Sequence, residues 1–487
     1  MASMFTEEKI QGLFGSLAAE DESVDRLKEY FFKTDVYDKI HNNLPLRILV
    51  AHKGIGKSAM FKISFLENQK ENNLSLWVKP DDIYEFGKGD KNSDFIQLIR
   101  SWKSGLESLI AKLVMEEFSL GTDDDAVNLL SNKAVRAVDK ILGFCKKAQE
   151  LVDIDAVKKE TAKQYLKNKK LIVFIDDLDR GWDGSKESIT RVSALLSAVR
   201  DMSNDIPGLC FRISLRSDVY YLVRTSDEST DKIEGNVVWL SWTEHQLLVL
   251  LVKRVNSFLG NKLSEKRLTE LPQAKLVEYL EPIMDTYFMG DGKWNNRRIN
   301  YIILSLIRRR PRDLVNLCTM AARRANENNH DKIKTDDWET VFDSYSLDRL
   351  QDTINEHRYE LPDVEPLLMG MKPNKKTRKT REAFTYSTTD LLAKIRGIMQ
   401  RRQFRYSYGK VANEYELLTF LFKINFIVGR KTLSDGYIDR KYFEDNRYIS
   451  SQFRDFGYDW EVHPAFRWAL SPERRDIFST MALPEYI

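Results

Sequence analysis

Short runs of bulky apolar residues alternate with helix-patterned segments through the first half of the chain. The clearest run is 171–175, where five apolar residues follow one another, as expected for a strand buried on both faces. Between the runs, segments such as 59–67 and 188–202 repeat apolar residues at helical intervals. The predicted strands are 44–50, 74–78, 171–175, 210–215 and 237–240. This alternation predicts an α/β fold with a parallel sheet covered by helices on both faces.

Changes in pattern divide the chain further. Residues 1–43 are helix-patterned, and the patterns at 95–117 and 126–152 form a helical insertion at about residues 80–168 of a core assigned to 44–245. A mainly helical lid is predicted over 246–345, a polar and basic connector over 346–383, and a C-terminal domain over 384–487. In the last of these, an amphipathic helix at 414–427 precedes an expected hairpin around Gly429 and Gly436, which predicts a winged-helix-like module.

A glycine-rich turn follows the first predicted strand and reads Ala51-His52-Lys53-Gly54-Ile55-Gly56-Lys57-Ser58. It matches the phosphate-loop pattern GxxxxGK[ST], with Ala51 in place of the first glycine. Glycines let the backbone N–H groups turn toward phosphate oxygens, and the next helix adds its positive end. Lys57 is expected on the β- and γ-phosphates and Ser58 on Mg²⁺. A chance Gly-Lys-Ser is disfavoured by the strand before it and the helix after it. The predicted ATP site comprises Lys53, Gly54, Ile55, Gly56, Lys57, Ser58 and Ala59.

Carboxylates directly follow the strand 171–175. Burying a strand that ends in Asp176 and Asp177 is costly unless these side chains have a role. Asp176 is expected to hold Mg²⁺, because this cation prefers oxygen ligands. Asp177 is expected to act as the catalytic base that orients the attacking water. Helix capping is the competing interpretation, and it suits Asp179 better than the other two.

The phosphate loop together with Ile175-Asp176-Asp177-Leu178-Asp179-Arg180-Gly181-Trp182 resembles the KAP and STAND-like branches of P-loop ATPases, above all the bacterial members. The resemblance covers roughly residues 27–325 and, more weakly, the C-terminal tail. It implies a parallel-sheet P-loop NTPase core with a helical lid, which hydrolyses ATP as a nucleotide-gated switch or motor. Related ATPases often belong to anti-phage defence systems. AAA+ ATPases usually carry glutamate at the position of Asp177, so the shorter aspartate implies slow hydrolysis.

Further residues are candidates by position in related ATPases. At the end of the strand 210–215, either Ser214 or Arg216 resembles a first sensor of the γ-phosphate, although an ordinary strand end explains them as well. Arg312, beside Pro311 at a helix start, resembles the second sensor of origin-recognition-type ATPases, and a basic helix cap is the alternative. Arg224 is a weak candidate for an arginine finger.

Charge and cysteine content limit the classes of partner and the compartment that can be expected. The net charge is only +3, so any attraction to nucleic acid must be local. The three cysteines are far apart, which disfavours disulfides and zinc, and no apolar run is long enough to cross a membrane. The chain is therefore expected in the cytoplasm. The basic side chains expected to face nucleic-acid phosphates are Arg401, Arg402, Arg405, Lys410, Arg430 and Lys431.

Three hypotheses for function remain open. In the first, the chain is an ATPase that forms homo-oligomers and acts with a separate effector protein in defence. In the second, it is an origin-recognition-like protein that binds DNA through its C-terminal domain when ATP is bound. A scaffold that binds nucleotide without useful turnover is a third.

Overall fold

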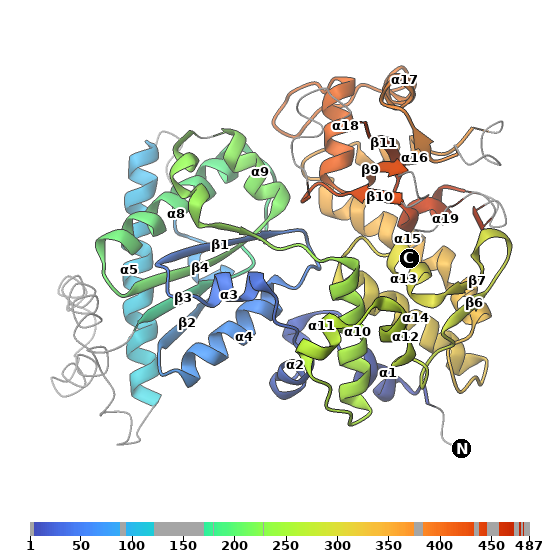
Figure 1. Cartoon of the computed structure of the whole chain (residues 1–487). Coiled ribbons are helices and arrows are strands. Elements are labelled where there is room, and N and C mark those ends of the chain that lie inside the picture. Colours follow the sequence, from blue (N-terminus) through green and yellow to red (C-terminus); the bar gives the residue numbers. More distant parts are fainter. Residues whose placement is uncertain are drawn as a thin grey trace. The chain divides into compact units, whose positions relative to one another are not determined.

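The computed structural model describes residues 4–87, 94–120, 170–178, 180–226, 228–374, 383–432, 438–445, 457–471, 477–478 and 481. It divides into two compact units (Figure 1). The α/β unit comprises residues 33–53 and 57–240, and the helical unit comprises residues 1–32, 54–56 and 241–487. The predicted features outside the described residues are the helix 126–152, Cys145, Asp179, Gly436 and most of the basic run 372–381.

A five-stranded parallel sheet lies at the centre of the α/β unit. Its order, β2-β3-β4-β1-β5, places β4 between the strand before the phosphate loop, β1, and the strand before the aspartates, β3. The predicted fold, a parallel-sheet P-loop NTPase core, is confirmed. The strands β1 to β5 are Leu46–Ala51, Leu74–Val78, Leu171–Ile175, Leu209–Arg216 and Val237–Trp239.

Helices cover both faces of this sheet, as the fully buried strands require. On one face, Val173 shares a core with residues of α5 (Phe95–Leu120) and α8 (Lys186–Asp205). On the other, the Phe174 ring lies 5.5 Å from that of Phe61 on α4 (Lys57–Lys70). Figure 1 shows α4 and α8 on opposite sides of the strands. The remaining helices of this unit are α3 (Asp35–His41) and α9 (Ser217–Ser226).

The N-terminal helices divide between the units. Whereas α3 packs on α4, α1 (Glu7–Phe14) and α2 (Val24–Tyr30) pack on α10 (Glu244–Phe258) of the helical unit. Polar contacts support this packing: the Arg26 guanidinium donates to Ser257 Oγ at 2.6 Å, and the Arg254 guanidinium lies 4.2 Å from the centre of the Tyr30 ring. Helical periodicity alone could not assign these helices to different units.

The lid helices continue past the predicted boundary at residue 345. After α13 (Ile299–Leu306) and α14 (Pro311–Glu327), α15 runs unbroken over Thr335–His357. Leu350 and Ile354 in its second half are buried, so the first part of the predicted connector is helical. One polar residue of that half, Arg349, forms a buried ion pair with Asp313 of α14. The smaller elements between α10 and α13 are α11 (Glu265–Glu270), α12 (Gln273–Glu278), β6 (Tyr287–Met289) and β7 (Asn295–Arg298).

The C-terminal module combines helices with a four-stranded antiparallel sheet of order β10-β9-β11-β8. The helix pair α17 and α18 precedes the β9–β10 hairpin, as expected for a winged-helix-like module. Gly429 pairs with Lys441 inside β9, so it does not form the hairpin turn. The elements are α16 (Val364–Gly370), β8 (Thr385–Tyr386), α17 (Thr388–Met399), α18 (Glu414–Lys423), β9 (Ile427–Thr432), β10 (Ile438–Lys441), β11 (Asp459–Val462) and α19 (Arg467–Leu470).

Two further predictions concern cysteines and membranes. Cys210 and Cys318 are buried, and burial raises the pKa of both thiols. Among the described residues, no helix is both long and apolar enough to cross a bilayer.

Candidate nucleotide-binding site

The phosphate loop joins β1 to α4, in the strand–turn–helix context that its sequence predicts. Gly54 and Gly56 have φ angles of +77° and +105°, which side chains rarely adopt. Lys57 is the first residue of α4, so the loop ends at the positive end of that helix. The Lys57 ammonium lies over the loop, with Nζ 3.4 Å from the carbonyl oxygen of Ala51. Ser58 and Ala59 follow in the first turn, half-buried, while Lys53 is exposed.

The tip of the loop, residues 54–56, belongs with the helical unit. Trp242 Nε1 donates to the carbonyl oxygen of Ile55 at 2.9 Å, and the Arg312 N–H donates to that of Gly54 at 3.2 Å. A Cβ atom placed on Gly54 would be 3.0 Å from Cβ of Arg312, so only glycine fits there without displacement. The candidate second sensor, Arg312, therefore lies directly against the loop tip. Its guanidinium Nε donates to the carbonyl oxygen of Leu17 at 3.2 Å.

Asp176 directly follows β3 as a buried carboxylate with 5% of its surface exposed. The Ser214 hydroxyl, on the neighbouring strand β4, donates a short hydrogen bond to Asp176 Oδ1. This bond orients the carboxylate and leaves it acceptor capacity for a cation. Together with the Ser58 hydroxyl, it supplies the oxygen donors that Mg²⁺ takes, so the residues present fit this metal.

Asp177 differs from its neighbour in both exposure and backbone conformation. It is exposed, and its φ of +59° lies in the left-handed region, which non-glycine residues adopt uncommonly. Aspartate tolerates that region better than most residues, and such backbone strain gathers at functional sites. The chain thus turns sharply after Asp176, so consecutive carboxylates are buried and exposed respectively.

The two candidates for the first sensor have different partners. Ser214 is fully buried on Asp176, whereas Arg216 forms a two-point pair with Asp218, with contacts of 3.0 and 2.6 Å. The Arg216 side chain is only 11% exposed in this pair. Of the two residues, the structure brings Ser214 to the acidic strand end. Arg224 pairs with Asp231 and Glu234 on the surface.

A histidine inside the loop was not predicted as part of the site. His52 is buried, and its Nδ1 lies 2.9 Å from the Ser217 hydroxyl at the start of α9. This contact connects the loop to the end of β4, next to Arg216. The available signal was its position: a polar residue directly after a buried strand needs a partner.

Of the arginines that precede α14, Arg308 and Arg310 are buried. Arg308 pairs with Asp313 at 2.8 Å, and Arg349 of α15 reaches the same carboxylate at 2.9 Å. Despite its burial, these arginines hold the pKa of Asp313 far below its usual range. The network fixes the start of α14, and therefore the position of Arg312.

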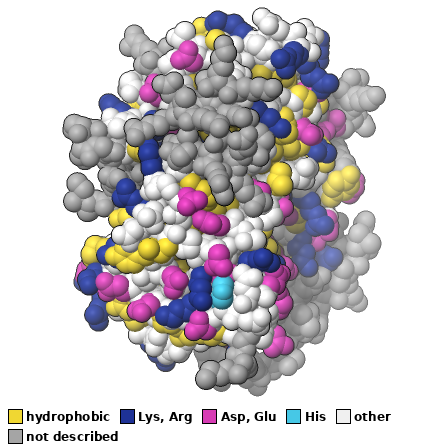
Figure 2. Space-filling model, turned by 90° about the vertical axis from the view of Figure 1, so that its right-hand side faces the viewer, with side chains coloured by type: hydrophobic (Ala, Val, Ile, Leu, Met, Phe, Trp, Pro, Cys, Tyr) yellow, Lys and Arg dark blue, Asp and Glu magenta, His cyan; other side chains and the backbone are white. Residues whose placement is uncertain are grey.

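The basic residues of the C-terminal module are partly neutralised. Arg402 pairs with Asp363, Lys410 with Glu416 and Arg430 with the buried Glu461. The first turn of α18 is acidic, and its half-buried Glu414 and Glu416 pair with Arg396 and Lys410. On the face in Figure 2, basic and acidic side chains are interspersed over the described surface. Arg401, Arg405 and Lys431 remain exposed.

Comparison with known proteins adds a partial family match. A family model described as the FunZ-associated C-terminal helical domain matches residues 245–354, from α10 into α15. The putative transposon gamma-delta 80.3 kDa protein of Escherichia coli (strain K12) is 24% identical over 391 residues. That alignment covers 74% of this chain but only 53% of the relative, so the chain spans about half of the relative's length.

Similar solved structures include the Aeropyrum pernix ORC2 protein, in ADPNP and ADP complexes, with a TM-score of 0.40 and 11% identity over 93% of this chain and 90% of that one. Cdc6p from Pyrobaculum aerophilum has a TM-score of 0.31 and 11% identity, covering 96% and 97% of the two chains. A single-substitution variant of Thermotoga maritima RuvB has a TM-score of 0.28 and 13% identity, covering 73% and 78%. These superpositions are too loose to transfer any residue's role.

Proposed function

We propose that this protein is an ATPase in which bound ATP and Mg²⁺ act as a conformational switch. The observation that carries the proposal is the pairing, within one parallel sheet, of a glycine-rich loop ending in Lys57-Ser58 with the buried Asp176–Ser214 pair. Lys57 would move from its loop carbonyls to the β- and γ-phosphates. Ser58 and Asp176 would hold Mg²⁺, which supplies positive charge beside the phosphates.

Asp177 is the proposed base. Its exposed carboxylate, directly after the metal-holding residue, would orient water against the γ-phosphate. Ser214, on the oxygen of Asp176, would register whether a metal and a γ-phosphate are present. Arg216 can contribute only if it leaves Asp218, so we propose Ser214 as the first sensor and Arg216 as a secondary one.

Arg312 is proposed to transmit the nucleotide state. Because it lies against Gly54, a shift of the loop tip on ATP binding would move the start of α14 directly. The buried charge network behind it would carry that movement into α15. The resemblance to KAP and STAND-like ATPases supports homo-oligomers, a separate effector protein and a role in anti-phage defence as parts of the same proposal.

The test is nucleotide binding by the Lys57→Ala variant, measured by calorimetry with ATP and Mg²⁺. We expect affinity to fall severely, because the cation opposite the phosphates is lost. Lys70→Ala, at the far end of the same helix, is the matched control and should bind as the parent does. Unchanged affinity in Lys57→Ala would exclude the loop as the nucleotide site.

ATP-dependent DNA binding is a second candidate, favoured by the winged-helix-like module and the exposed Arg401, Arg405 and Lys431. The two candidates differ in what stimulates turnover. Duplex DNA should raise the ATPase rate if DNA is the partner, whereas higher protein concentration should raise it if self-assembly is the trigger.

A further inference from the structure

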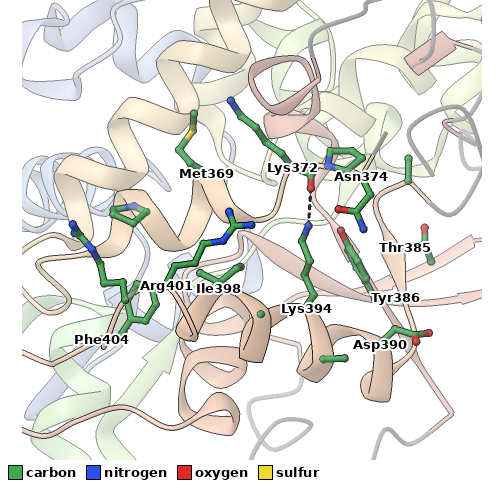
Figure 3. A pocket seen from close by; sticks show the side chains of 17 residues that line it. Met369, Lys372, Asn374, Thr385, Tyr386, Asp390, Lys394, Ile398, Arg401 and Phe404 are labelled. Carbon is green, nitrogen blue, oxygen red and sulfur yellow. Dashed lines mark hydrogen bonds between the residues drawn. The ribbon is translucent and has the colours of Figure 1, made fainter. Parts of the chain in front are cut away.

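A pocket of about 1110 Å³ lies in the C-terminal module, beside α16 and α17 and the strand β8 (Figure 3). Its size is close to the range of small-molecule sites, and it is separate in sequence from every residue of the phosphate loop. The function proposed above gives it no role.

The charges that line the pocket are predominantly positive: Lys372, Lys394, Arg401 and Arg402 face a single carboxylate, Asp390. Asp390 accepts the Ser387 hydroxyl at 2.7 Å, in the first turn of α17, and Arg402 is paired with Asp363. Among the described residues, no carboxylate lies within ion-pair distance of the other three cations. Their charges are therefore available to an anion.

Lys394 is the best-placed of these cations. It is half-buried, and its Nζ donates to the carbonyl oxygen of Lys372 at 2.7 Å, which fixes the ammonium at the pocket wall (Figure 3). Burial, and then the nearby charge of Arg401, lower the pKa of Lys394. Both effects disfavour the charged lysine in the free protein, and the negative charge of a bound anion would offset them.

The rest of the lining offers apolar surface. Met369, Ile398 and Phe404 line the pocket together with the helical glycine Gly397 (Figure 3). A Cβ atom on Gly397 would meet nothing within 4 Å, so α17 presents bare backbone there. At the end of α16, in contrast, a Cβ on Gly370 would come 2.7 Å from Ile398 Cδ1, which shows how closely the two helices pack. A flat ring fits such a surface, which lies beside cations.

We propose that this pocket binds a nucleotide-sized phosphorylated ligand, with its phosphates on Lys372, Lys394 and Arg401 and its ring against Met369, Ile398 and Phe404. A concave pocket of this size favours a free small ligand over a continuous nucleic-acid strand. The site would give the module a ligand of its own, distinct from the ATP of the phosphate loop.

The experiment uses the full chain carrying Lys57→Ala, so that the phosphate loop does not contribute, and titrates it with inorganic pyrophosphate and with ADP by calorimetry. We expect both to bind at one site, ADP more tightly because of its ring. Arg401→Glu should weaken both by about tenfold or more, since it replaces an attractive charge with a repulsive one. Arg405→Glu, an exposed arginine outside the lining, is the matched control and should change neither.

A steric variant separates the pocket from general charge effects. Gly397→Phe fills open space on a helix that tolerates larger residues, so it should fold, keep pyrophosphate binding and lose ADP binding. Failure of pyrophosphate to bind would overturn the proposal, as would ADP binding that survives both Arg401→Glu and Gly397→Phe. Binding of a single-stranded oligonucleotide without any binding of ADP would also overturn it and assign the surface to nucleic acid. Because Lys57→Ala is present throughout, none of these results depends on the proposed ATPase site.

Discussion

Among single residues, the consecutive carboxylates Asp176 and Asp177 show how one backbone turn gives identical side chains different surroundings. Asp176 is buried on the Ser214 hydroxyl, while the left-handed φ of Asp177 turns the next carboxylate outward. A buried, hydrogen-bonded carboxylate suits a fixed cation. An exposed carboxylate suits the binding of a water molecule.

The two substitutions should therefore fail differently. Asp176→Asn removes a charge from the proposed Mg²⁺ site, so both ATP affinity and hydrolysis should fall. Asp177→Asn should keep ATP bound and lose about 10² to 10⁴ in turnover, the usual contribution of a positioned base. Paired measurements of ATP affinity and phosphate release distinguish the two. If Asp177→Asn hydrolyses ATP at the parent rate, the base is another residue, and Asp179 is the next to test.

Among the helices and strands, α14 connects the loop tip to the lid. Its first residues face different surroundings: Arg312 lies on Gly54, while Asp313 is buried between Arg308 and Arg349. The helix start is therefore held from behind by ion pairs while its front residue touches the loop. A rigid element with one contact at the loop tip is suited to transmitting small movements.

If Arg312 is the second sensor, as proposed, Arg312→Ala should leave ADP affinity near the parent value but reduce ATP turnover by about 10²-fold to 10³-fold, the usual cost of removing one electrostatic contact to the transition state. Arg323→Ala provides the control, because it lies on the same helix but pairs with Glu7 on the surface. Steady-state phosphate release and ADP titration measure the two effects. Equal losses in both variants would mean that Arg312 acts through helix stability alone.

The segment after β11 makes stability depend on pH. His463 is fully buried, accepts the Ala465 N–H on Nδ1 at 3.1 Å and contacts the Tyr442 hydroxyl. Burial, and then the charges of Arg440 and Arg308, hold its pKa well below the ordinary histidine value of 6.5. The folded protein therefore keeps His463 neutral, whereas the unfolded chain takes up a proton as the pH falls through 6.5.

Because the unfolded state binds the additional proton, the free energy of unfolding should fall below that pH, by at most about 1.4 kcal/mol per pH unit for this group. Urea unfolding at about pH 7.5 and about pH 5.5 measures the slope. His463→Gln cannot titrate and should show a shallower slope, even if it is less stable at both pH values. An equal slope in the variant would show that other groups set the dependence.

In the molecule as a whole, the units are built on different principles. The α/β unit is a parallel sheet buried on both faces, while the helical unit contains both the lid and the winged-helix-like module. The module packs on α15 through η6 (Pro464–Phe466) and α19, and the buried Lys423 pairs with Glu360. The module is thus best tested within the full chain.

If DNA is a partner, its binding should fall steeply between about 50 and about 200 mM salt, since phosphate contacts release counterions. The double variant Arg405→Glu, Lys431→Glu should weaken binding at low salt, because both side chains are exposed cations of the C-terminal module. Lys70→Glu, on the α/β unit, is the control. Fluorescence anisotropy with a labelled duplex measures the affinity for DNA. Equal affinity in the parent, the double variant and Lys70→Glu would exclude this surface as the DNA-binding site.

The order of residues within short segments was enough to predict the phosphate loop, the acidic strand end and the parallel sheet. Gly54 and Gly56 after one buried strand indicate a phosphate loop, and Asp176 after another indicates an acidic strand end. Neither pattern depends on how the rest of the chain folds. Apolar runs buried on both faces also predict their own strands. For the same reason, the lid and the winged-helix-like module could be recognised from periodicity and hairpin signals.

The partners of these residues, in contrast, depend on how the chain packs. Ser214 rather than Arg216 reaches Asp176 because β4 pairs with β3 in a register that aligns Ile213 with Ile175, and neither strand order nor register is a local property. No local pattern shows that Arg308 is buried against Asp313, or that Arg349 of α15 reaches the same carboxylate. Likewise, the helices before residue 43 divide between units through packing with distant segments, such as the contact of Arg26 with Ser257, which are 231 positions apart. Sequence patterns specify which residues will be buried, but only the tertiary packing determines which residues they contact.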